Sequence, residues 1–105
     1  MMNNNTAYTE RNNLGLSSSQ MKLKTLITDI ETRSDKNGQD YWIIRTQTNE
    51  QTKKNYLAFS TDFNLAAPTL ALLRDSPEKL VNQITLLTIK KKDELEKVIN
   101  IEIAK

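Results

Sequence analysis

Apolar and polar residues alternate along much of the chain after residue 20, which is the pattern of half-buried β-strands. The first such segment, "MKLKTLITDIETR", begins at Met21, and its apolar positions change from odd to even numbers part-way along. We expect one long strand whose buried face switches at a bulge or a strong bend. Two more strands, "DYWIIRTQT" and "KNYLAFS", follow after short polar loops. Three strands joined in this way predict an antiparallel meander.

The pattern then becomes helical. "STDFNLAAPTLALLRD" opens with residues that favour a helix N-cap, and Pro68 within it either breaks the helix or begins a second one. In "SPEKLVNQ", Ser76 is a candidate N-cap and Pro77 the first helical residue. We therefore expect helix between about residues 62 and 82.

The C-terminal third allows two interpretations. "ITLLTIKKK" has the composition of a strand, and in "VINIEIA" the residues Ile99, Ile101 and Ile103 alternate with polar or small residues. Leu95, Val98, Ile99 and Ile103 also fit the stripe of a helix. The density of β-branched residues favours a strand, with a helix over residues 93 to 104 as the alternative.

Composition indicates one domain preceded by a tail. The chain has 105 residues, of which 37% are hydrophobic, and its mean hydropathy is −0.61. Residues 1–20 are rich in Asn and Ser, and we expect a disordered tail there, followed by a folded domain over residues 21–105. No run approaches the roughly 18 apolar residues of a membrane span. We expect an intracellular protein, cytoplasmic or, in a eukaryote, nuclear.

Several kinds of chemistry lack their residues. Cysteine and histidine are absent and there are two glycines, which argues against zinc sites, triad-type nucleophiles and glycine-rich phosphate loops. Four acids (Asp29, Glu31, Asp35 and Asp40) surround the first loop, but their spacing matches no calcium loop. We expect no enzyme activity, no metal and no cofactor.

The order of elements, three strands, a helical insert and two strands, is that of a mainly β, five-stranded OB-fold Greek-key barrel. The run "DIETRSDKNGQDYWIIRTQT…NYLAFS" resembles the first three strands of OB-fold single-strand-binding domains in the replication protein A family and its archaeal relatives. The likeness lies in a charged first strand, a loop ending in Gly, "YW" opening the second strand and "AF" closing the third. It implies binding of single-stranded nucleic acid, with DNA favoured and little sequence preference, in DNA replication or repair.

The resemblance also implies where the ligand binds: on strands two and three, flanked by the loops "SDKNGQ" and "KKKDELEK". Alternation separates Trp42 and Ile44 from Tyr41 and Arg45, but periodicity alone does not decide which set faces out. We expect Trp42 and Ile44 in the barrel interior and Tyr41 with Arg45 on the outer face, and the family pattern puts Phe59 on the ligand side. We expect Tyr41 and Phe59 to stack on bases while cations neutralise phosphates. The candidate binding residues are Arg33, Lys36, Tyr41, Arg45, Lys53, Lys54, Phe59, Lys90, Lys91 and Lys92.

A second function remains open. Strand aromatics are often core residues, and surface lysines are often only solvated. The net charge is just +2, and the acids dilute the basic residues around the first loop. An OB-fold subunit that binds other proteins within a larger complex is therefore the alternative.

Overall fold

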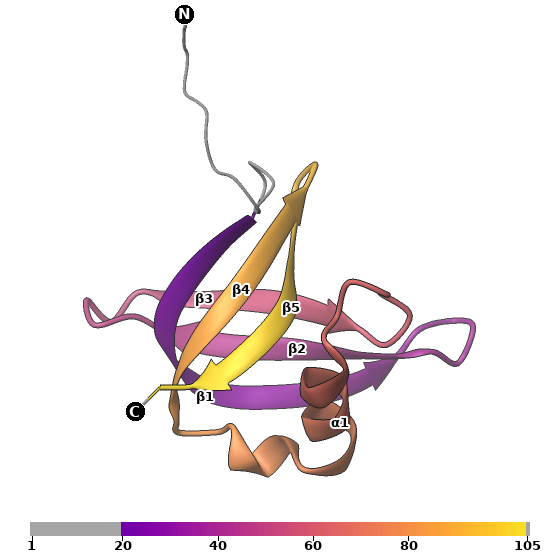
Figure 1. Ribbon diagram of the computed structural model, residues 1–105, viewed down its shortest axis with the longest axis horizontal. Helices are drawn as coiled ribbons and strands as arrows, with labels where there is room; N and C mark the ends of the chain where they lie inside the picture. The colour runs from indigo at the N-terminus through magenta and orange to yellow at the C-terminus, as the bar shows by residue number, and fades with distance from the viewer. Residues whose placement is uncertain (1–19, 105) are drawn as a thin grey trace, which may run out of the picture.

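The chain forms a closed five-stranded barrel with the strand order β1-β2-β3-β5-β4, seen in a computed structural model that describes residues 20–104 (Figure 1). The expected tail, except for Gln20, lies outside the described residues. The strands are β1 (Gln20–Ser34), β2 (Asp40–Gln47), β3 (Lys53–Phe59), β4 (Ile84–Lys92) and β5 (Leu95–Ile103). The expected three-strand meander is present, because β1 pairs with β2 and β2 with β3, both antiparallel.

The long first strand closes the barrel. Its first half pairs with β4 and its second half with β2, with Leu26 belonging to both ladders. The register shifts between Ile27 and Asp29. Thr25 and Ile27 are buried before this shift, whereas Ile30 packs against the core after it. The predicted switch of the buried face is confirmed, and it lets one strand belong to both halves of the barrel.

The helical insert is shorter than expected. Helix α1 (Ala67–Asp75) starts with Pro68 in its first turn, where the missing N–H is not needed, so this proline opens the helix. Residues 60–66 instead form turns, and the second predicted helix is one 3₁₀ turn, η2 (Pro77–Lys79). The start of α1 is attached to β5, because the Ala66 N–H donates to the Ile99 carbonyl (2.8 Å) and the Ile101 N–H to Thr69 Oγ1 (3.1 Å).

The C-terminal segment is a strand, so the helical alternative is wrong. β5 pairs antiparallel with β4 and meets β3 in parallel at Leu57 and Lys97. A register shift opposite Thr88 and Ile89 leaves Ile99 as an extra residue, and consequently both Val98 and Ile99 are buried. This bulge explains why the apolar spacing of the segment resembles that of a helix.

The core fills the barrel and extends under α1. Trp42 and Ile44 are fully buried within it, as expected, and Tyr56 and Ala58 of β3 join them. Leu73 of α1 closes the core at one side. No helix in the described part of the chain is long and apolar enough to cross a membrane.

Candidate ligand face on β2 and β3

Four apolar side chains occupy the outer surface of β2 and β3. Because Trp42 and its neighbours point inward, the alternate residues Tyr41 and Ile43 point outward from β2, and Leu57 and Phe59 do so from β3. The register sets Tyr41 opposite Phe59 and Ile43 opposite Leu57. All four are half-buried. We call Tyr41, Ile43, Leu57 and Phe59 the β2–β3 face.

Two predicted site residues form a stacked aromatic pair on this face. The ring centroids of Tyr41 and Phe59 are 5.9 Å apart, and the ring planes differ by 28°. Such an offset pair is a favourable arrangement for two aromatic rings. The pair places both rings beside each other at one end of β2 and β3.

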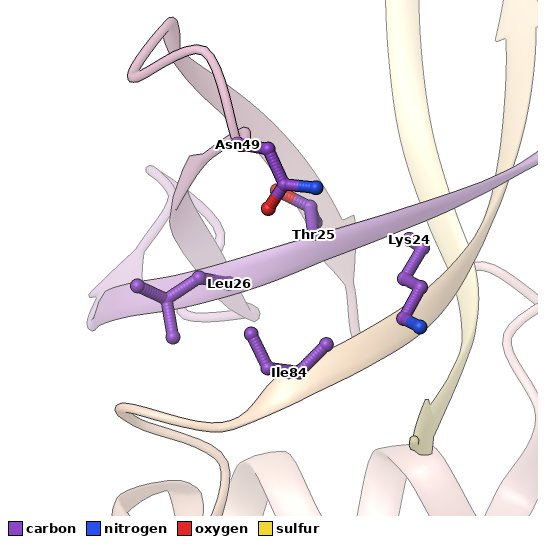
Figure 2. Close-up of a pocket in the computed structure, with 5 residues that line it drawn as sticks. All are labelled: Lys24, Thr25, Leu26, Asn49 and Ile84. Carbon is purple, nitrogen blue, oxygen red and sulfur yellow. The ribbon is translucent and has the colours of Figure 1, made fainter. Parts of the chain in front are cut away.

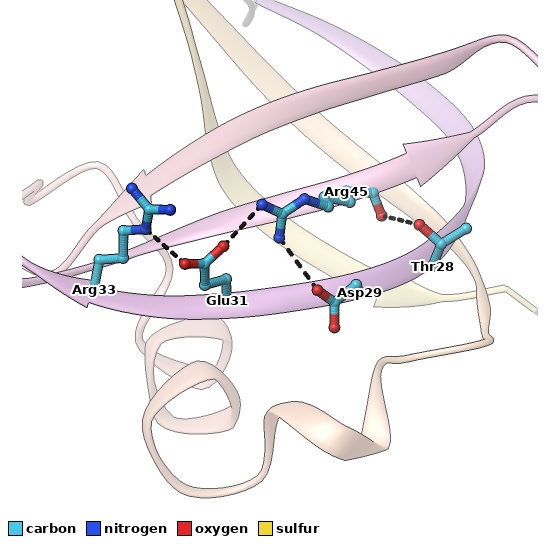
Figure 3. Close-up of polar contacts among 5 residues, drawn as sticks. All are labelled: Thr28, Asp29, Glu31, Arg33 and Arg45. Atoms are coloured by element: carbon cyan, nitrogen blue, oxygen red, sulfur yellow. Dashed lines mark hydrogen bonds and ion pairs between the residues drawn. The ribbon is translucent and has the colours of Figure 1, made fainter.

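The two predicted arginines lie along the β1 edge of the face, held by acids (Figure 3). Arg45 donates to Glu31 (2.8 Å) and to Asp29 (3.2 Å), and Arg33 donates to the other oxygen of Glu31 (2.7 Å). Hydrogen bonds from Arg33 and then from Arg45 lower the pKa of Glu31 below its usual value. Each guanidinium therefore already has a carboxylate partner, and the two positive charges are matched by two negative charges.

The predicted lysines on β3 are divided between two environments. Lys54 points to the same side as Tyr56, with its Nζ 2.7 Å from Glu96 Oε1 and 5.4 Å from the Tyr56 ring centroid. The hydrogen bond to Glu96 raises the pKa of Lys54. Lys54 therefore lies off the β2–β3 face. Lys53 is exposed and lies opposite Gln47, beside the turn that joins the two strands.

The two loops expected to flank the face have different positions. The first loop carries Lys36 and is folded around the Asp35 carboxylate, which accepts the N–H groups of Asn37 (2.8 Å) and Gln39 (2.9 Å). The β4–β5 hairpin, with Lys90, Lys91 and Lys92 on β4, projects from the top of the barrel in Figure 1, whereas the first loop extends to the right. The two loops do not meet across the face.

Several residues near the β2–β3 face were not predicted as site residues from the sequence. Lys97 of β5 borders Leu57, and its Nζ is 3.2 Å from Oδ2 of Asp62, whose side chain is only 6% exposed. The next residue, Phe63, is almost completely exposed. Strand alternation in "ELEKV" could have placed Lys97 on the outer face, but nothing in the sequence indicates that Asp62 turns toward it.

A separate cavity of about 280 Å³ lies near the middle of β1 (Figure 2). It is lined by Lys24, Thr25, Leu26, Asn49 and Ile84. The Thr25 hydroxyl donates to the Gln47 carbonyl (3.0 Å), and Lys24 and Asn49 are the other polar side chains of the lining. Within residues 20–104, no three acidic, histidine or cysteine side chains gather as metal ligands.

No protein-family model matches this chain, and no curated protein matches it. Function is therefore inferred from the side chains of the β2–β3 face and its borders.

Proposed function

We propose that the chain is an OB-fold domain that binds single-stranded nucleic acid across the β2–β3 face. The strand order β1-β2-β3-β5-β4, the shared first strand and the helix between β3 and β4 support the fold assignment. In five-stranded barrels of this kind, strands two and three and their flanking loops form the usual ligand surface. Single-stranded DNA is the first ligand to test.

The stacked pair of Tyr41 and Phe59 is the observation that carries this proposal. Two half-exposed rings on adjacent strands offer surfaces on which bases can stack, at roughly 1–3 kcal/mol per base. Because every base has a π-face, such contacts discriminate weakly among sequences. The neighbouring Ile43 and Leu57 extend the apolar surface along the same strands.

Charge makes a smaller contribution in this proposal. Arg33 and Arg45 are paired with Glu31 and Asp29, so a phosphate must compete with carboxylates for the guanidinium groups. Few counterions are then released on binding, and the affinity falls only gently as salt rises. We expect stacking to dominate the free energy of binding.

Substitution of the two rings tests the proposal. Phe59→Ala and Tyr41→Ala should each weaken binding of a fluorescein-labelled oligothymidine by roughly 1–3 kcal/mol, measured by anisotropy. Ile84→Ala, on an exposed residue of β4, is the matched control and should bind like wild type. Circular dichroism verifies that each variant is folded. Unchanged affinity in both aromatic variants, or no binding by wild type at low salt, would contradict the proposal.

A protein ligand is the second candidate. The aliphatic centre of the face, Ile43 and Leu57, and the matched charges along its edge resemble the core and rim of a protein interface. This candidate predicts that wild type binds no oligonucleotide even at low salt. The same titration therefore separates the two functions.

A further inference from the structure

Phe63 is the most exposed large apolar side chain between residues 20 and 104. It is 94% exposed, whereas the next such residue, Ile103, is 46% exposed. Leaving a phenylalanine in water instead of burying it gives up about 1.5–3 kcal/mol. The chain contains only two phenylalanines, and the other, Phe59, belongs to the β2–β3 face.

The backbone around Phe63 is tightly held, so its exposure is not the result of a loose loop. Asp62 donates its N–H to the Phe59 carbonyl (3.1 Å), and its carbonyl accepts the Leu65 N–H (3.0 Å). The Asp62 carboxylate accepts the Asn64 N–H (3.0 Å) and pairs with Lys97 (3.2 Å). Leu65 is buried in the core. Both sides of Phe63 are therefore anchored while its ring points into solvent.

The loop starts where the stacked pair ends. The Ser60 N–H donates to the Asp40 carbonyl (3.1 Å), which joins the end of β3 to the start of β2. Figure 1 shows the segment between β3 and α1 leaving the barrel at this end. Four residues of chain reach at most about 14 Å, so Phe63 lies within a few nucleotides' length of Phe59.

We propose that Phe63 is a third stacking platform for an unpaired base. A single nucleic-acid strand whose bases stack on Tyr41 and Phe59 continues past the end of β3, and a further base of it stacks on Phe63. The Asp62–Lys97 ion pair serves to hold the loop in the required position. This inference rests on the proposed function. It adds to the binding surface a residue outside β2 and β3, and it requires an oligonucleotide long enough to reach from Phe59 to Phe63.

Two variants of the full-length chain test the proposal against a series of labelled oligothymidines of increasing length. Phe63→Ala should weaken binding of the longer oligonucleotides by about 5-fold or more, and it should leave binding of the shortest ligands unchanged. Phe63→Tyr retains a ring and should bind like wild type. Because the side chain is exposed, both variants should keep the melting temperature of wild type.

A direct optical readout comes from Phe63→Trp. The native Trp42 is buried, so acrylamide should quench mainly the tryptophan fluorescence of the exposed indole at position 63. Long oligothymidines should quench this emission and protect it from acrylamide. If wild type binds and Phe59→Ala weakens binding, but Phe63→Ala changes affinity at no length and the new emission is not quenched, the inference is wrong and the proposed function stands. A wild type that binds no oligonucleotide overturns both, and leaves Phe63 as a protein contact.

Discussion

Replacing Glu31 by glutamine should make oligonucleotide binding stronger at low salt and more sensitive to salt. Glu31 accepts from Arg33 (2.7 Å) and from Arg45 (2.8 Å). Together with Asp29, which also pairs with Arg45, it balances the two arginines, so the cluster has no net charge. Glu31→Gln leaves two positive charges against one negative charge beside the stacked aromatic pair.

The size of the effect follows from counterion release. Each phosphate neutralised on a single strand contributes about 0.7 to the slope of log K against log salt. The freed Arg33 should therefore steepen the slope by about 0.7. If Arg45 also leaves Asp29, the change is about 1.4. A change of 0.7 means that, between about 50 and 200 mM salt, the variant loses about 2.5-fold more affinity than wild type.

Fluorescence anisotropy over a salt series measures both slopes. Glu78→Gln is the matched control, because it removes the same negative charge at a different place. Glu78 lies in η2, whereas Glu31 lies on the edge of the β2–β3 face. The account predicts a steeper slope for Glu31→Gln only. Equal slopes for the two variants would refute the claim that Glu31 restrains the arginines at a nucleic-acid interface.

Three further predictions concern the scaffold. Trp42→Ala should destabilise the barrel by about 3–5 kcal/mol in urea denaturation. Trp42→Phe should cost less than about 1 kcal/mol, because the buried indole N–H has no partner among the described residues and removing this N–H offsets the lost contacts; equal losses for the two variants would contradict this. Asp35→Ala should cost about 1–2 kcal/mol because two loop N–H groups lose their acceptor, whereas Asp35→Asn should cost less; denaturation curves that coincide for the two variants would argue against this role. Burial raises the pKa of Tyr56 above its usual 10.0, so the protonated phenol contributes fully to stability below pH 10, and this contribution is lost as pH rises through the pKa of the folded state. The melting temperature should therefore fall less at alkaline pH in Tyr56→Phe than in wild type, and an identical fall would contradict the assignment.

Strand alternation was sufficient to predict most of the barrel. The odd-to-even change in "MKLKTLITDIETR" indicates the bulge near Ile27. A period of two puts Trp42 and Ile44 on one face, and the structure shows that this face is the interior. The extra residue Ile99 made β5 ambiguous, because a bulge adds a residue to one strand without changing the local composition. Pro68 allowed either a break or a start, and the backbone of α1 selects the start.

The site was less predictable because it depends on contacts between distant residues. Tyr41 and Phe59 could be proposed as ligand-face residues, Tyr41 from its place in the second strand and Phe59 from the family resemblance, but their stacking on each other was not predicted. The pairing of Lys54 with Glu96 joins β3 to β5, and that of Lys97 with Asp62 joins β5 to a loop. No local pattern predicts such partners. Phe63 lay within an expected helix, so its exposure became evident only when residues 60–66 proved to be turns.

Chemical-shift mapping by NMR tests the central claim most directly. The ¹⁵N-labelled full-length chain is titrated with an unlabelled oligothymidine at low salt, and backbone amide shifts are followed. The account predicts saturable changes concentrated at Tyr41, Ile43, Leu57 and Phe59, with little change at Leu26 and Ile84 beside the cavity in Figure 2. Changes centred on the β1–β4 side, or no changes at all, would contradict the claim that the β2–β3 face binds single-stranded nucleic acid.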